Sequence, residues 1–179
     1  MNHQDILTFW FEELSPRQRF AKDAALDQAI RTRFGNTLQA AARCELFAWC
    51  ASPQGRLAEI VVLDQFSRNV YRDTPRAFAQ DALALVLAQE LAASRQDRSL
   101  PLAQRSFAYM PYMHSESALM HAQAVALFDQ PGMEETWRFE LHHKSIIDRF
   151  DRYPHRNTLL GRTSSAEELA FLSGPGSSF

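Results

Sequence analysis

Apolar side chains recur every three or four residues along almost the whole chain, which is the period of one face of an α-helix. Clear stripes of this kind occupy residues 6–14, 26–38, 57–61 and 139–150. The one run rich in β-branched residues, 60–63, lies at the end of such a stripe and gives no separate evidence for a strand. The pattern therefore predicts an all-α protein.

Capping residues mark where several of these helices begin. Ser15 and Ser52 each precede a proline, and a serine cap followed by proline is typical of the first turn of a helix. Asp23 is placed to cap a long helix that runs toward Leu46. Ser164, with a glutamate three residues later, has the spacing of a capping box and predicts a last short helix.

Short connections between these segments predict about eight helices packed as antiparallel pairs. The length of 179 residues fits one domain, to which we assign residues 1–172. The remaining tail, 173–179, is rich in serine and glycine, and we expect it to be disordered.

Composition and charge narrow the class of protein. A formal charge of −2 gives no overall attraction to nucleic acid or to an anionic membrane surface, and no apolar run approaches the ~20 residues of a membrane span. Cys44 and Cys50 lack metal-ligand spacing and are expected to be small buried side chains in a reducing compartment. Because the N-terminus also shows no leader pattern, we predict a cytoplasmic protein that binds neither nucleic acid nor membrane.

Three polar clusters interrupt the apolar pattern, and the first is LDQFSRN at 63–69. Asp64 and Arg68 lie four residues apart on one predicted helix and continue its apolar stripe, so we expect an ion pair directed toward the core. This pair has two interpretations. It fixes the segment that follows, or Asp64 orients Arg68, with Asn69 beside it, toward a ligand carboxylate or phosphate.

The second cluster is MPYMHSE at 110–116. Pro111 is expected to end one helix, and His114, Ser115 and Glu116 are expected to form the first turn of the next, with Ser115 as a cap. Beside this structural interpretation stands a functional one, in which the exposed amides of that turn and His114 form one wall of a polar cleft.

The third cluster is HHKSIIDRFDRYPHRNTLLGR at 142–162, where a helix is expected to break at the Tyr-Pro step and to resume as a short helix ending at Gly161. His143 lies on the apolar stripe, so we expect it to be buried. It is usual for such a histidine to be a core residue satisfied by one hydrogen bond. Paired with Asp64 or Glu116, however, it becomes a candidate general base or metal ligand.

Basic residues are in excess in this third cluster. From Arg138 to Arg162 six Lys and Arg residues face three acids, although the chain as a whole is slightly acidic. A basic run is often only a solvated face, but this one alternates with aromatic residues, which favours a site for an anion. The candidate ligand-binding residues, with those of the first cluster, are Arg68, Asn69, Arg149, Arg152, His155, Arg156, Asn157 and Arg162.

Taken in order, these motifs resemble the bacterial domain-of-unknown-function family 924. The residues that carry the resemblance are FWF at 9–11, RFAKD at 19–23, LDQFSRN at 63–69, HSE at 114–116 and the long motif at 143–162. The resemblance implies a tetratricopeptide-like helical fold, whose stacked helix pairs leave a concave face able to hold a ligand or a peptide.

The chain departs from the family pattern at three positions. Arg19 stands where tryptophan is common, which puts an aromatic wall there in doubt, and Ser67 replaces a proline. Asp151 replaces a glycine, and a left-handed backbone is expected there because aspartate tolerates that conformation better than most residues. Family membership implies no particular function.

Three hypotheses about function follow from these residues. The first is a binding module for a small anionic ligand or an acidic peptide. The second is a hydrolase-type enzyme, with or without a metal ion, whose candidate catalytic residues are Asp64, His114, Glu116 and His143. The third is a buried polar network that only fixes how helices join. Since motifs for nucleotides, metals and known hydrolases are missing from the sequence, we predict no cofactor and no metal, and leave the oligomeric state open.

Overall fold

A computed structural model describes residues 1–177 and is helical throughout, with no strand in that range, which confirms the all-α prediction. The chain divides into two compact units, which are described separately. The N-terminal unit comprises Met1–Arg72 and Arg76–Pro111, and the C-terminal unit comprises Asp73–Pro75 and Tyr112–Phe179.

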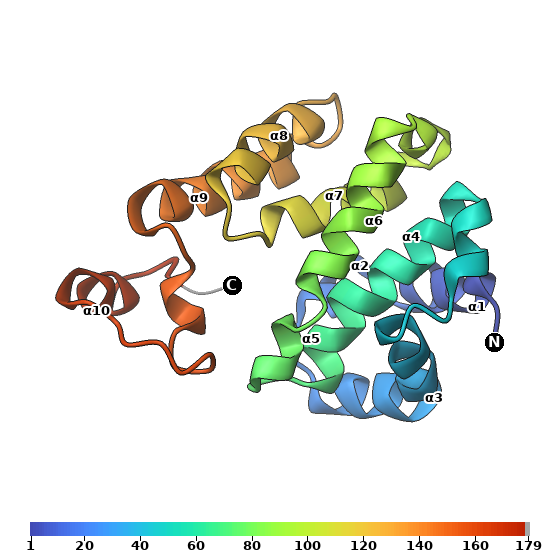
Figure 1. Cartoon of the computed structure of the whole chain (residues 1–179), viewed down its shortest axis with the longest axis horizontal. Helices are drawn as coiled ribbons and strands as arrows, with labels where there is room; N and C mark the ends of the chain where they lie inside the picture. The colour runs from blue at the N-terminus through green and yellow to red at the C-terminus, as the bar shows by residue number, and fades with distance from the viewer. Residues whose placement is uncertain (178–179) are drawn as a thin grey trace. The chain divides into compact units, whose positions relative to one another are not determined.

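The elements up to residue 113 are mostly α-helices joined by short 3-10 and π-helical segments (Figure 1). They are α1 (His3–Thr8), η1 (Phe9–Glu13), α2 (Pro16–Phe20), α3 (Ala24–Ala42), η2 (Phe47–Ala51), α4 (Pro53–Val61), η3 (Val62–Phe66), α5 (Ser67–Val70), η4 (Pro75–Phe78), α6 (Asp81–Ala93), η5 (Gln96–Ser99) and α7 (Leu102–Met113). Within this unit α4 packs against α1 and α6, and α3 packs against α5 and η3.

Aromatic rings form the centre of the N-terminal core. Trp10 and Phe66 are fully buried with their ring centroids 5.6 Å apart, and Phe34 lies 5.1 Å from Phe66. The predicted caps position these elements, since Ser15 and Ser52 accept hydrogen bonds from backbone amides three residues later and Asp23 caps α3. The apolar stripes thus became the core, as expected from their period.

The end of α3 differs from the prediction. The helix stops at Ala42 rather than near Leu46, because Cys44 adopts a left-handed backbone with φ 58°. The amide of Glu45 donates to the Ala40 carbonyl and that of Cys44 donates to the Ala41 carbonyl, which is the hydrogen-bond pattern of a Schellman motif. Cys44 is exposed and Cys50 is half-buried, so the expectation of two buried thiols was wrong.

The C-terminal unit is built on the pair α8 (Ala118–Phe128) and α9 (Glu134–Phe150), which lie side by side in Figure 1. The connection from α9 to α10 (Ala166–Leu172), residues 151–165, is called the hinge below; it contains the short 3-10 segment η6 (Pro154–Arg156). Asp151 has φ 54°, which confirms the left-handed backbone expected at the position where the family pattern has glycine. No second α-helix follows before Gly161, in contrast to the prediction.

Two helix boundaries were predicted wrongly. Pro111 does not end α7, which continues to Met113, because a proline this close to a helix end removes only one of its last hydrogen bonds. His114, Ser115 and Glu116 consequently lie in the loop before α8 rather than in its first turn. The final capping box is formed by Ser165 and Glu168, one residue later than expected.

Part of the predicted disordered tail makes contacts within the C-terminal unit. The hydroxyl of Ser177 donates to the carbonyl oxygens of Leu172 and Gly174, at 3.1 and 2.9 Å. The Gly176 carbonyl lies 2.8 Å from Nε2 of His142. Residues 178 and 179 of that tail are outside the described residues, so disorder there stays a prediction.

Candidate functional site

The first polar cluster lies on η3 and α5 of the N-terminal unit. Asp64 is fully buried, and its carboxylate Oδ1 lies 2.9 Å from Nη1 of Arg68, which confirms the predicted ion pair. The sequence did not reveal the second partner, Asp81 in the first turn of α6, whose two carboxylate oxygens lie 2.9 and 3.0 Å from the same guanidinium. Arg68 therefore connects η3 to α6.

Asn69 and Arg72 connect the same segment to α3. The Asn69 amide donates to Asp27 at 2.7 Å, and Arg72 donates to both oxygens of Asp27, at 2.5 and 2.7 Å. Burial alone would raise the pKa of the Asp27 carboxyl, but these hydrogen bonds and the nearby positive charge lower it below its ordinary value. Asn69, a predicted ligand contact, thus holds a helix in place.

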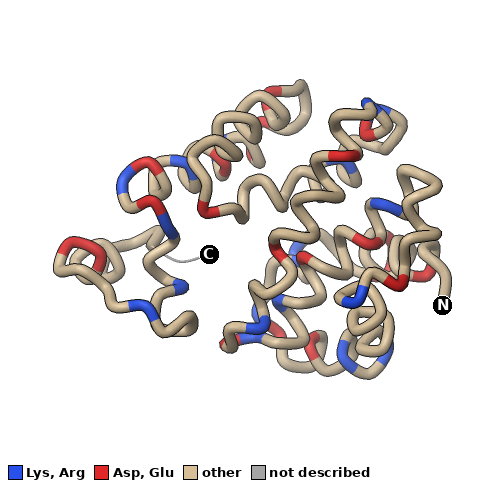
Figure 2. The backbone as a smooth tube through the Cα atoms, viewed as in Figure 1, with Lys and Arg blue, Asp and Glu red and all other residues tan. Residues whose placement is uncertain are grey.

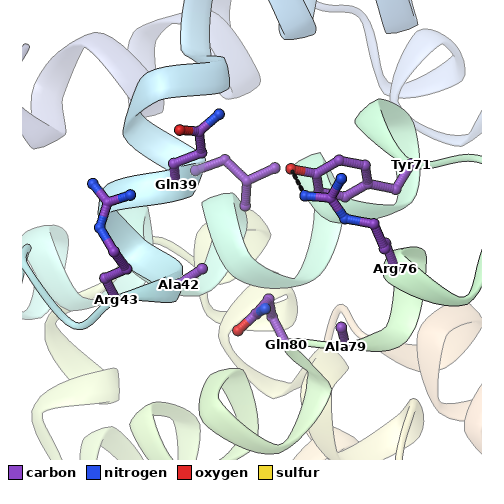
Figure 3. A pocket seen from close by; sticks show the side chains of 8 residues that line it. Gln39, Ala42, Arg43, Tyr71, Arg76, Ala79 and Gln80 are labelled. Atoms are coloured by element: carbon purple, nitrogen blue, oxygen red, sulfur yellow. Dashed lines mark hydrogen bonds between the residues drawn. The ribbon is translucent and has the colours of Figure 1, made fainter.

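A pocket of about 300 Å³ lies beside these connections, within the N-terminal unit (Figure 3). It is called the α3 pocket, and its lining residues are Leu38, Gln39, Ala42, Arg43, Tyr71, Arg76, Ala79 and Gln80. Leu38 and the two alanines supply apolar surface, while two amides and two guanidinium groups supply donors. The sequence reasoning missed this pocket, because its walls come from three separate segments and only Tyr71 follows closely on a motif.

Arg76 is the most distinctive group of the α3 pocket. Its Nη2 donates to the Tyr71 hydroxyl at 2.8 Å, and its guanidinium lies over the Tyr71 ring, 3.9 Å from the centroid. In the part of the chain that the structure describes, no carboxylate lies within ion-pair distance of Arg76. The side chain is exposed and carries its charge into the pocket without an acidic partner.

In the C-terminal unit, Glu116 joins the second and third clusters. Its carboxylate accepts two hydrogen bonds from Arg162, at 2.6 and 2.9 Å, and one from the Tyr153 amide at 2.8 Å. Burial alone would raise the pKa of Glu116, but these donors and the charges of Arg156 and Arg162 lower it. HSE therefore contacts the hinge through Glu116, which acts as an acceptor and not as a first-turn residue of α8.

Two further arginines of the third cluster are paired with α10. Arg149 contacts Glu167 at 2.7 Å, and Arg152 contacts both oxygens of Glu168, at 2.6 and 2.7 Å. Arg152, together with the Ser165 amide and Asn157, lowers the pKa of Glu168 to about 2. In Figure 2 the acidic positions of α10 and the basic positions of the hinge lie in the same part of the C-terminal unit. The local basic excess is thus compensated by Glu116, Glu167 and Glu168, which lie outside the stretch where it was counted.

The centre of the hinge is buried. Arg156 is 5% exposed, and its guanidinium lies 4.6 Å from the centroid of the Tyr153 ring, which also has the His155 ring 5.6 Å away. The fully buried Asn157 donates to the Ser164 hydroxyl at 3.0 Å and to Glu168 at 3.3 Å. Since η6 is only three residues long, the anion site expected at a helix N-terminus has no such helix to form it.

His143 is buried as predicted, and its environment fixes its protonation. Nδ1 donates to the Phe139 carbonyl at 2.7 Å, so the second ring nitrogen is left as the acceptor of a neutral imidazole. Burial, together with the nearby imidazoles of His114, His121 and His142, lowers the pKa of His143 to about 3, although the hydrogen bond to Phe139 acts in the opposite direction. A base with this pKa is a weak acceptor of protons near pH 7.

A buried pair that the sequence reasoning missed lies next to it. His121 and Glu140 are both fully buried, with Nδ1 and Oε1 2.7 Å apart. Nε2 of His121 lies 2.9 Å from the Ser115 carbonyl and 3.1 Å from the Tyr153 hydroxyl, which itself donates to the Met113 carbonyl. Nε2 therefore carries a hydrogen, and the pair fastens the HSE loop to α8 and α9. The sequence signal for this pair was Glu140, an acidic residue on the buried face of α9.

No group of three or more His, Cys, Asp or Glu side chains within residues 1–177 is arranged to hold a metal ion. Over the same residues, no helix has the length and apolar character needed to cross a membrane.

Comparison with known proteins shows the family. The model of the family described as "Bacterial protein of unknown function (DUF924)" matches residues 6–176, so the chain belongs to that family. A solved structure of a protein of unknown function from Agrobacterium tumefaciens is similar, with a TM-score of 0.91 and 36% identity over 96% of this chain and 97% of that one. No curated protein matches the chain.

Proposed function

We propose that this member of the DUF924 family is a binding module for a small anionic ligand, and that the ligand occupies the α3 pocket. The observation that carries the proposal is Arg76, a guanidinium that lines the pocket and has no carboxylate partner among the described residues. A carboxylate or phosphate accepts two parallel hydrogen bonds from such a group, and charge-assisted bonds of this kind are about twice as strong as neutral ones.

Tyr71 prepares Arg76 for this role. Its hydroxyl accepts one guanidinium hydrogen bond and its ring supports the guanidinium face, so the cation is positioned before a ligand arrives. A side chain that is already ordered loses less conformational freedom on binding, which leaves more of the interaction energy as affinity.

The LDQFSRN stretch has a supporting role in this proposal. Arg68 holds the segment to α6 through Asp81, and Arg72 holds it to α3 through Asp27. The walls of the α3 pocket come from the end of α3, from Tyr71 and from the residues that lead into α6. The motif then acts on ligand binding through the position of Tyr71, and not through direct contact by Arg68 or Asn69.

The third cluster fits the structural hypothesis better than the binding hypothesis. Arg149, Arg152 and Arg162 each have a carboxylate partner in their own unit. At Arg152 and Arg162 an anion would have to displace a carboxylate held in a largely buried bridge, so we interpret the hinge as a network that fixes α8, α9 and α10. The hydrolase hypothesis has weaker support, because the neutral His143 is poorly matched to general-base catalysis near pH 7.

Two more specific predictions, on the helix arrangement and on the cellular location, remain proposals. A tetratricopeptide-like arrangement stays an expectation from the family resemblance. A cytoplasmic location is supported by the two free thiols, one of them exposed, which a reducing compartment would keep reduced.

Titration calorimetry with phosphate and acetate tests the proposed function. We expect binding that weakens as salt is added, and an affinity about tenfold to hundredfold lower in Arg76→Gln, the equivalent of losing one charge-assisted hydrogen-bond pair. Arg17→Gln is the matched control, because Arg17 is an exposed arginine of the same unit and does not line the pocket. Equal affinities in both variants, or no binding of either anion at low salt, would contradict the proposal.

A further inference from the structure

We propose that the ligand of the α3 pocket carries two anionic groups, the first bound by Arg76 and the second by Arg43 in exchange for Glu45. This inference rests on the proposed function and names the ligand class: a small dianion, such as a dicarboxylate or a phosphonocarboxylate, with a short apolar linker.

The arrangement of the lining residues supports two anionic groups. In Figure 3 Arg43 and Arg76 stand on opposite sides of the pocket, one at the end of α3 and the other on η4. The lining also includes Leu38, Ala42 and Ala79, whose side chains offer no hydrogen bonds and suit methylene groups. A monoanion would satisfy one guanidinium only, whereas a dianion would use both ends and the apolar middle.

The size of the pocket limits the ligand. Its volume of about 300 Å³ is at the lower end of the range for pockets that hold small molecules. An acidic peptide would need an extended groove, so this volume favours a compact metabolite over the peptide alternative.

Arg43 already binds a carboxylate, and this contact is easily exchanged. Nε and Nη2 of Arg43 lie 2.7 and 2.9 Å from the two oxygens of Glu45, the two-point geometry that a ligand carboxylate would adopt. Both side chains are more than half exposed, at 59% and 52%. Exposed ion pairs contribute little to stability, so replacing Glu45 by a ligand carboxylate removes little from the protein.

The backbone keeps Glu45 next to Arg43 as an internal competitor. The two residues flank the left-handed Cys44, and the amides of Arg43 and Glu45 both donate to the Ala40 carbonyl. Glu45 does not line the pocket, so it draws the guanidinium from outside. Removing its charge should therefore release Arg43 for the ligand.

The test compares ligands of matched length by titration calorimetry at constant ionic strength. The probes are succinate, glutarate and adipate, butyrate as a monoanion, and 3-phosphonopropionate to separate a carboxylate from a phosphonate at one end. The proteins are the full chain and its Arg43→Gln, Glu45→Gln, Arg76→Gln and Arg17→Gln variants, each checked for an unchanged melting temperature.

We expect at least one dianion to bind about tenfold more tightly than butyrate, as one added charged contact would give. Arg43→Gln should remove this difference and leave butyrate binding unchanged. Glu45→Gln should tighten binding of the dianion only, and Arg76→Gln should weaken binding of every probe.

Two results would overturn the inference, and they are distinguishable. If butyrate and the dianions bind equally well and both depend on Arg76, the dianion assignment is wrong and the proposed function stands. If no probe binds to any variant, including Glu45→Gln, the proposed function fails together with the inference.

Discussion

The α3 pocket and the hinge are both rich in arginine, yet their arginines are in different states. At the hinge, Arg152 and Arg162 are held by Glu168 and Glu116, and the amide of Tyr153 adds a further bond to Glu116. In the pocket, Arg76 is held by the hydroxyl and ring of Tyr71 alone among the described residues. A charge paired in a largely buried bridge serves the fold, whereas one without an opposite charge, or in an exposed and exchangeable pair such as Arg43–Glu45, is available to a ligand.

This difference shows why counting charges along the sequence does not distinguish arginines that are paired in the fold from arginines that are not. The third cluster has a clear basic excess, but its acidic partners come from other segments. The region around the pocket has no such excess, and only the position of Arg76 relative to carboxylates distinguishes it. Each prediction below probes one side of this comparison.

The largest change in unfolding free energy is expected at the buried His121–Glu140 pair of the C-terminal unit. Glu140→Ala leaves the fully buried His121 without its Nδ1 partner, and breaking a buried pair in this way costs about 3–5 kcal/mol of unfolding free energy. Urea denaturation measures the change. Glu135→Ala, at an exposed position of the same helix, is the control and should stay within about 0.5 kcal/mol of the parent protein. Similar losses in the two variants would argue against a structural network.

The next prediction compares an arginine of the hinge with an arginine of the α3 pocket. Arg162→Ala removes both donors from one side of Glu116 and should lower the unfolding free energy by about 2 kcal/mol, because a partly buried carboxylate loses its ionised partner. Arg76→Gln should leave stability within about 0.5 kcal/mol and weaken anion binding instead. The comparison fails if Arg76→Gln unfolds the protein or if Arg162→Ala abolishes binding while leaving stability intact.

His143 should make the protein less stable as pH falls from 7 to 5. Its folded-state pKa of about 3 lies below the ordinary value of 6.5, so the unfolded chain binds the proton more readily as pH falls. The stabilisation is complete above pH 6.5 and is lost as pH falls toward 3. Between pH 7 and pH 5 the loss is about 2 kcal/mol for one group.

His143→Gln isolates this contribution, since glutamine does not titrate. Burial raises the pKa values of Glu59 and Glu140, and these groups change stability in the opposite direction, so the parent protein and the variant are compared at each pH. The unfolding free energy of the variant should depend less steeply on pH in this window. An identical pH slope in both proteins would rule out His143 as the source.

The smallest change in unfolding free energy is expected at Cys44, which follows the pocket residue Arg43. Cys44→Gly places glycine at a left-handed position that closes α3, where side chains are disfavoured, and should raise the unfolding free energy by about 0.5–1 kcal/mol. Anion affinity should not change, because Arg43 keeps its backbone position. A loss of stability, measured by thermal denaturation, would show that the thiol makes contacts that outweigh the relief of strain.

The sequence alone determined the features that depend on neighbours within about four residues. The apolar period placed the helices and their buried faces, the caps at Ser15, Asp23 and Ser52 marked their starts, and the spacing of Asp64 and Arg68 specified an ion pair. All of these follow from backbone geometry over one helical turn. The left-handed backbone at Asp151 was indicated instead by the family resemblance, in which glycine stands at that position.

Only the tertiary structure decided what the charged residues do. Arg162 meets Glu116 across 46 residues and Arg72 meets Asp27 across 45, and no local pattern carries such a pairing. The α3 pocket likewise depends on how α3, the segment after α5 and the start of α6 are packed. Because the state of an arginine is set by the carboxylates that reach it in space, chain packing distinguished a structural cation from one available to a ligand.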